Sequence, residues 1–250
     1  MTEKRYYDSK NNCLVYTGSK ASNDYWDEHW QMADFSKMIK VSYNPFIIRN
    51  TKKHLARGSR IMEGGCGRGQ NVYILKKQGF DAIGIDYAKK TVDKINNCMP
   101  ELNVEFGDVR KLPFDNNSFD GYWSLGVIEH FYEGYNDIMM EMHRVLKPNG
   151  ILLMTVSTMS PLRQMKSNFN LYPAWEGEKK KIAEFYQFAL DPIVIIKNFE
   201  SNGFELLTKK PYDGFKGLKD EIKIIKKPLQ YIYDSNFILN KIIKKWVLTS

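Results

Sequence analysis

The sequence predicts an α/β protein built around a doubly wound, mainly parallel sheet. Short apolar runs rich in β-branched residues alternate with amphipathic stretches, as in consecutive strand and helix units. A glycine-rich turn joins the first such run to the first such helix. The 250 residues, 43% of them hydrophobic, suffice for one substantial core.

Six apolar runs are predicted as strands, at residues 60–62, 82–86, 103–106, 119–125, 151–157 and 204–208. Residues 70–78, 89–97 and 135–146 have apolar positions three to four apart, which predicts helices, and another helix is expected near 191–201. Residues 147–150, Lys-Pro-Asn-Gly, supply a helix stop and a turn.

Two regions fall outside this alternation within what we expect to be one globular unit. Residues 1–50 are predicted as an N-terminal helical, aromatic cap on a main domain at 51–250, and residues 159–189 as an insertion that covers the ligand site. Ligands of open α/β sheets bind beyond the carboxyl ends of the strands, where these regions could close over them. The substrate or lid candidates are Trp26, Trp30, Tyr172 and Trp175. Packing is the competing interpretation for all four aromatics.

Composition favours a soluble, cytoplasmic protein. Charges interrupt every apolar stretch before the roughly 18 residues that a membrane span needs, and no apolar signal core is evident. Cys13, Cys66 and Cys98 form no CxxC pair and have no histidine at zinc-ligand spacing. We therefore expect reduced thiols and no metal site.

The net charge of +8 leaves an anionic partner, such as RNA or a lipid surface, as an alternative. Lysine predominates over arginine, which an AT-rich coding sequence would also produce. The excess is concentrated in residues 179–245, with 14 Lys against 8 acidic residues. Any nucleic-acid contact is therefore expected on the C-terminal third.

The most informative motif is an acidic residue at a strand end followed by G-x-G-x-G at a helix start, with glycines at Gly65, Gly67 and Gly69. Glycine permits backbone angles and close ligand approach that a Cβ would obstruct. The dinucleotide fingerprint G-x-G-x-x-G would place its third glycine at Gln70 or Val72, so NAD is disfavoured.

Two more acidic residues end the next two strands. Asp86 lies where a carboxylate can accept hydrogen bonds from ribose hydroxyls, and Tyr87 could then flank an adenine. Asp108 could accept from the adenine amine while the Val109 backbone meets a ring nitrogen. Each aspartate alone could be a cap or turn residue. Together with Glu63 they favour a nucleoside site.

Residues 60–157 resemble the class I S-adenosylmethionine-dependent methyltransferases, closest to the type 11 group. The resemblance is carried by Glu63-Gly64-Gly65-Cys66-Gly67-Arg68-Gly69, Gly84-Ile85-Asp86, residues 107–120, residues 124–130 and residues 144–152. It implies a Rossmann-like methyltransferase fold of the seven-stranded type and S-adenosylmethionine as cofactor, with S-adenosylhomocysteine as product. The implied cofactor-binding residues are Glu63, Gly64, Gly65, Cys66, Gly67, Asp86, Tyr87, Asp108, Val109, Ser124 and Leu125.

The implied activity is in-line methyl transfer to oxygen, nitrogen or carbon of a small molecule. The alternatives are an RNA methyltransferase using the basic C-terminal third, and a non-catalytic, cofactor-binding subunit. Positioning and water exclusion can catalyse this displacement, so no base is assigned. Glu129 and His130 are the candidates if the acceptor is a hydroxyl, although family members share this run irrespective of substrate.

Two departures from family patterns bear on these expectations. After residues 204–208 only Lys-rich amphipathic stretches follow, at 217–233 and 236–247, so the seventh strand is in doubt. Ser124-Leu125-Gly126-Val127 stands where amino-methylating enzymes carry an N-P-P-Y-like loop, which disfavours methylation of adenine N6 or glutamine. The acceptor, its nucleophilic atom and the oligomeric state are left open.

Overall fold

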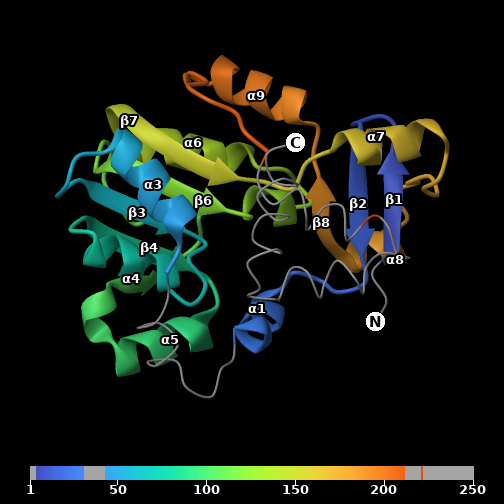
Figure 1. Cartoon of the computed structure of the whole chain (residues 1–250). Coiled ribbons are helices and arrows are strands. Elements are labelled where there is room, and N and C mark those ends of the chain that lie inside the picture. The colour runs from blue at the N-terminus through green and yellow to red at the C-terminus, as the bar shows by residue number, and fades with distance from the viewer. Residues whose placement is uncertain (1–3, 31–42, 212–220, 222–250) are drawn as a thin grey trace, which may run out of the picture.

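The protein contains a central parallel sheet and a smaller antiparallel sheet that stands beyond one end of it (Figure 1). The computed structural model describes residues 4–30, 43–211 and 221. Within these residues no helix is long and apolar enough to cross a membrane.

The central sheet has five strands in the order β5-β4-β3-β6-β7. They are β3 (Arg60–Gly64), β4 (Asp81–Asp86), β5 (Val104–Phe106), β6 (Phe119–Leu125) and β7 (Leu146–Thr155). Each pairs in parallel with its neighbours, so all carboxyl ends lie at one edge. The predicted doubly wound, mainly parallel sheet is confirmed, with five strands in the described residues.

Helices cover both faces of this sheet. One face carries α3 (Pro45–His54), α4 (Gln70–Lys77) and α5 (Lys89–Cys98), and the other carries α6 (Asn136–Val145) and α9 (Pro192–Ser201). Because successive strand residues point to opposite faces, Tyr122 packs with the α6 side and Trp123 with the α3 side. Both side chains are fully buried.

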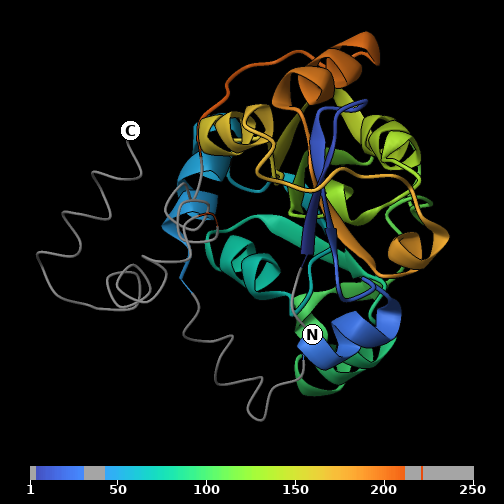
Figure 2. The ribbon, with the colours of Figure 1, turned by 90° about the vertical axis from the view of Figure 1, so that its right-hand side faces the viewer.

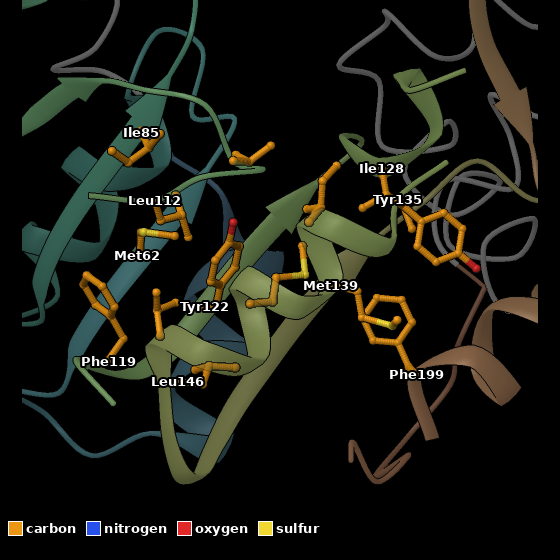
Figure 3. Close-up of a cluster of buried hydrophobic side chains, with 14 of the residues drawn as sticks. Met62, Ile85, Leu112, Phe119, Tyr122, Ile128, Tyr135, Met139, Leu146 and Phe199 are labelled. Atoms are coloured by element: carbon orange, nitrogen blue, oxygen red, sulfur yellow. The ribbon is translucent and has the colours of Figure 1, made fainter. Parts of the chain in front are cut away.

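The core on the α6 side joins the sheet to both helices. Figure 3 shows Tyr122 of β6 and Met139 of α6 between the two elements, with Phe199 of α9 farther out. Met139 and Met142 are almost fully buried, as the three-residue spacing of a helix face requires. Ile128, in the loop that leaves β6, belongs to the same buried cluster, so this packing anchors the loop.

The smaller sheet joins the two regions that the sequence separates. It contains β1 (Lys4–Asp8), β2 (Cys13–Thr17) and β8 (Phe185–Ala189), in that order and all antiparallel. Figure 2 shows the β1–β2 hairpin, in blue, standing in front of the central sheet. Buried clusters lie on each side of it, one around Leu14 and Tyr16 and the other around Cys13 and Val15.

This arrangement changes part of the sequence interpretation. Residues 4–17 were expected in a helical cap but form a hairpin, because Asn12 adopts φ 46° at the turn between two β-prone runs. Helices α1 (Asn23–His29) and α3 supply the expected helical part of this region. The insertion contains α7 (Pro161–Asn168), α8 (Lys179–Ala183) and β8. The division into a cap, a main domain and an insertion stays a prediction.

The predicted strand at 204–208 is wrong. These residues form no strand, and Leu206 and Leu207 are exposed after α9. The physical reason is the lack of a pairing partner: β7 ends the order of the described sheet, and no described segment extends it there. The predictions for 217–233 and 236–247, and with them the seventh strand, concern segments outside the described residues except for Glu221.

Candidate functional site

The candidate site lies where the strand order of the central sheet reverses. From β3 the chain proceeds outward through β4 and β5 on one side, and then crosses to β6 and β7 on the other. The loops leaving β3 and β6 therefore diverge at the carboxyl edge, which is where open α/β sheets bind ligands. The glycine-rich loop follows β3 at this position.

The glycine-rich loop turns tightly from β3 into α4. Gly65 and Gly67 adopt φ angles of 71° and 53°, in the left-handed region that disfavours side chains. A Cβ on Gly65 would lie 2.6 Å from Val127 Cγ2, and one on Gly67 would lie 3.0 Å from the Trp30 ring. The loop thus needs glycine for its backbone angles and for the approach of two neighbours.

Cys66 turns away from the open side of the loop. Its backbone N–H donates to Ile85 O over 3.0 Å, and its side chain is buried. Its Sγ lies 2.7 Å from where a Cβ on Gly84 would be, so it points toward β4. Burial raises the pKa of the Cys66 thiol, so Cys66 is an unreactive core cysteine.

Glu63 is a buried carboxyl beneath the loop, 2% exposed. Asn71 Nδ2 donates to its Oε1 over 2.8 Å, while Oε2 has no hydrogen-bond partner among the described residues. Burial, with Asp86 nearby, raises the pKa of Glu63 to about 8 despite the Asn71 hydrogen bond. An incompletely satisfied buried carboxyl is costly, so this oxygen identifies a place for a polar ligand group.

Asp86 holds the glycine loop against β4. Its Oδ2 accepts from the Gly67 N–H over 2.7 Å, and its Oδ1 accepts from the Ala88 N–H over 2.9 Å. Each carboxylate oxygen has a second lone pair, so ligand hydroxyls could bind without displacing these bonds. Burial raises the pKa of Asp86, opposed by its backbone hydrogen bonds.

The residues at the end of β5 are arranged differently from Asp86. Arg110 holds the Asp108 carboxylate through Nε and Nη2, at 3.0 and 2.6 Å, and these bonds lower the pKa of Asp108 although burial opposes them. Val109 is buried in the α6-side core. A ligand amine at Asp108 would therefore share its carboxylate with Arg110.

Helix α1 extends across the loops that follow β3 and β4. Its Asp27 accepts from the Thr91 N–H over 2.9 Å and the Thr91 hydroxyl over 3.0 Å, at the first turn of α5. Asp27 thereby caps a helix whose own N-cap residue, Ala88, makes no side-chain bond. Tyr87 strengthens the attachment by donating from its hydroxyl to Ala21 O over 3.1 Å.

The two tryptophans of this segment lie beside the glycine loop and His130, and their role at a substrate or lid stays a prediction. Their rings stack with centroids 5.7 Å apart, Trp30 against Gly67 and Trp26 against His130. The Arg68 guanidinium lies 5.2 Å from the Trp30 ring centroid. Trp26 and Trp30 therefore bring an aromatic surface to the glycine loop and to the loop after β6.

Residues 62–154 match a family model described as a methyltransferase domain. That span contains the glycine loop, Asp86, Asp108 and the whole of β6. Over these residues the chain is therefore similar to known methyltransferase domains.

Relatives of this chain include proteins with and without an assigned activity. An uncharacterized protein of Methanocaldococcus jannaschii is 26% identical over 219 residues, covering 86% of this chain and 80% of that protein. A demethylmenaquinone methyltransferase of Lysinibacillus sphaericus is 26% identical, covering 66% of this chain and 79% of that enzyme. The corresponding enzyme of Staphylococcus epidermidis is matched over 52% of its length.

Solved structures agree in fold. A Pyrococcus horikoshii protein aligns with a TM-score of 0.53 and 18% identity, covering 74% of this chain and 89% of that chain. A Bacillus halodurans protein described as a candidate methyltransferase aligns with a TM-score of 0.51 and 18% identity, covering 79% and 87% of the respective chains. The Rossmann-like methyltransferase fold is thus established.

The remaining predicted site residues lie around β6 and the small sheet. Ser124 is buried and pairs with Gly64, and Leu125 pairs with Thr155. Tyr172 and Trp175 pack on the small sheet, in the clusters around Leu14 and Cys13 respectively.

The two candidate bases are held by neighbouring backbone. Glu129 is buried, and its Oε1 accepts from the Ser157 N–H over 2.9 Å. His130 Nδ1 lies 2.8 Å from Tyr186 O, so Nδ1 carries the proton in a neutral ring and Nε2 is the basic nitrogen.

Sequence reasoning missed Asp27 and Asn71. Both act across the fold: Asp27 caps a helix 64 positions away, and Asn71 orients Glu63 from α4. An Asp in an amphipathic helix and an Asn after a glycine turn are individually common. The only available signal was the absence of a capping side chain at Ala88.

Proposed function

We propose that this chain transfers the methyl group of S-adenosylmethionine to oxygen, nitrogen or carbon of a small molecule. One observation carries the proposal. Glu63 and Asp86 lie on β3 and β4 and Asp108 follows the neighbouring β5, at the carboxyl edge of a methyltransferase fold, where Asp86 binds the glycine loop. This set offers acceptors for an ammonium, a ribose and an adenine amine in one row.

Glu63, Gly65, Gly67 and Asp86 together form what we call the cofactor cradle. Its chemistry fits S-adenosylmethionine. The unpartnered Glu63 Oε2 suits the ammonium of the methionine moiety, and the positive φ angles at Gly65 and Gly67 leave backbone surface free of Cβ atoms. Asp86 has a further lone pair on each oxygen for the ribose hydroxyls. Bound here, S-adenosylmethionine would supply a methyl carbon activated by its sulfonium.

The protein's part in catalysis is to bind, align and exclude water. The Trp26 and Trp30 rings supply an apolar, π-rich surface that favours a cationic sulfonium over its neutral product. In-line displacement needs the nucleophile held on the far side of the methyl carbon. We assign no general base; Glu129 and His130 stay candidates for a hydroxyl acceptor.

The acceptor half of the site would be built from residues 1–50 and 159–189. Pairing of β2 with β8 unites these regions beyond the carboxyl edge, which supports that assignment. Two relatives are named demethylmenaquinone methyltransferases, so their acceptor is a small molecule, and this supports a small-molecule acceptor here. Most of the basic C-terminal third lies outside the described residues, and no described contact favours RNA.

Thermal-shift and acceptor assays test this proposal. S-adenosylmethionine and S-adenosylhomocysteine should stabilise the wild-type protein, whereas NAD should not. Asp86→Asn should lower both affinities at least about tenfold, since a charge-assisted hydrogen bond contributes about 1.5–3 kcal/mol. Asp93→Asn, at an exposed pair with Lys89, is the control. Release of S-adenosylhomocysteine with a panel of acceptors reports turnover. Stabilisation by NAD alone would overturn the proposal.

A further inference from the structure

A cluster of cations surrounds one buried carboxylate beyond the carboxyl edge of the central sheet. Glu221 Oε1 accepts from Arg5 Nη1 over 2.9 Å and from Arg163 Nε over 3.0 Å. Its Oε2 accepts from Lys166 Nζ over 2.8 Å and from the Tyr172 hydroxyl over 2.6 Å. Four donors thus converge on one carboxylate, which is the coordination of an anion-binding site.

Arg163 gives this cluster a fixed geometry. It is 8% exposed, and its Nη1 donates to Thr158 O over 2.7 Å. Because that carbonyl belongs to the segment immediately after β7, the guanidinium is oriented by the sheet edge itself. Arg5 extends from β1 and Lys166 from α7, so three elements supply the cations. A pre-oriented, buried guanidinium binds a carboxylate with little loss of side-chain entropy.

The cluster carries more positive charge than its own carboxylate neutralises. Arg163 and Lys166 alone place two cations against Glu221. These cations lower the pKa of Glu221 to about 2, although burial opposes them. The Lys166 side chain is 21% exposed while that of Glu221 is 1% exposed, so solvent reaches the cation that the carboxylate covers.

Contacts connect this cluster to the glycine loop. Gly65 packs against Val127, which is two residues before Glu129 in the loop after β6. Glu129 binds the N–H of Ser157, and the Ser157 hydroxyl lies 3.5 Å from Arg163 Nη1. The cluster is therefore linked, through Ser157 and Glu129, to the loop after β6 that packs against Gly65.

We propose that Arg5, Arg163, Lys166 and Tyr172 form a subsite for a carboxylate group of the methyl acceptor. In the structure the Glu221 carboxylate occupies this subsite. This inference rests on the proposed function and narrows its acceptor to an anionic small molecule. The acceptor carboxylate displaces that of Glu221 and takes over its four hydrogen bonds. A carboxylate is favoured because the group already bound there is one, and the cations of Arg5, Arg163 and Lys166 would face the entering anion.

Calorimetric titration with propionate, which matches the end of a glutamate side chain, tests the subsite. Glu221→Gln removes the competing charge, so propionate should bind this variant about tenfold more tightly than wild type. Adding Lys166→Met should lower that affinity at least about threefold, whereas Lys181→Met should not. Lys181 contacts Tyr6 of the same sheet but pairs with Glu178 outside the cluster.

Three results would overturn the inference: equal propionate affinity in wild type and Glu221→Gln, equal affinity with and without Lys166→Met, or a preference for inorganic phosphate. Glu221→Asp, which withdraws the carboxylate by one methylene, replaces Glu221→Gln if the latter does not fold, and it too should bind propionate more tightly than wild type. S-adenosylhomocysteine is titrated into the same variants. If S-adenosylhomocysteine binds normally but propionate binds the Glu221 variant no more tightly than wild type, only the subsite is refuted. If wild type does not bind S-adenosylhomocysteine, the proposed function is refuted.

Discussion

Gly65→Ala and Gly177→Ala form a matched pair that isolates the role of the glycine loop. The two glycines adopt nearly the same φ, 71° and 69°. An alanine therefore costs a similar backbone strain at both, about 1–2 kcal/mol for the left-handed region. They differ in surroundings, because a Cβ on Gly65 would lie 2.6 Å from Val127 Cγ2, whereas nothing lies within 4 Å of one on Gly177.

The structure gives a magnitude for this difference. Relieving the Val127 contact requires shifts in a packed loop, and overpacking of this kind costs about 1–3 kcal/mol. Gly65→Ala should therefore lower the free energy of unfolding by about 2–5 kcal/mol, against about 1–2 kcal/mol for Gly177→Ala. Urea denaturation measures both values.

The same pair should separate in cofactor affinity. A Cβ and a displaced loop at Gly65 should weaken S-adenosylhomocysteine binding at least about tenfold in calorimetry, whereas Gly177→Ala should leave it unchanged. Equal destabilisation and equal affinity in the two variants would refute the assignment of Gly65 to the cradle.

Three further predictions concern the groups around the loop. Asp27→Ala should destabilise the protein by about 1–2 kcal/mol in urea denaturation and weaken cofactor binding, because it removes the cap of α5 and the anchor of α1. Asp93→Ala, at an exposed pair on α5, should change the stability and the cofactor affinity by far less. Glu63 has a pKa of about 8 in the folded protein against an ordinary 4.5, so between these pH values the native state binds a proton that the unfolded state does not. The free energy of unfolding of wild type, relative to that of Glu63→Gln, should therefore fall as pH rises from about 4.5 to 8. A pH-independent difference would contradict the burial of this carboxyl. Trp30→Ala should weaken S-adenosylmethionine binding more than S-adenosylhomocysteine binding, since only the former carries the sulfonium charge, while Tyr43→Ala, at an exposed aromatic, should affect neither.

The central sheet could be predicted from sequence because its signals are local. Strand β6 begins and ends at the predicted residues, the glycine turn follows β3, and Asp86 ends β4, whereas Asp108 lies two residues beyond β5. Apolar periodicity and turn chemistry act within a few residues, so they leave a readable trace. The resemblance to methyltransferase domains rests on the same local motifs.

The small sheet and the Glu221 cluster could not be predicted because their contacts join distant positions. Leu14 pairs with Ala189, and Arg5 meets Glu221 across 216 positions. Nothing near Leu14 specifies that β8 is its partner, and an isolated hairpin is marginal until a third strand or core covers it. The predicted strand at 204–208 illustrates the converse: strand-like residues remain irregular without a neighbour.

Titration of S-adenosylmethionine into wild type and Asp86→Asn, with NAD as the competing ligand, tests the central claim most directly. The account predicts that wild type binds S-adenosylmethionine and not NAD, and that Asp86→Asn loses at least about tenfold in affinity while remaining folded. Binding of NAD by wild type, or an Asp86→Asn variant that binds S-adenosylmethionine as tightly as wild type does, would contradict it.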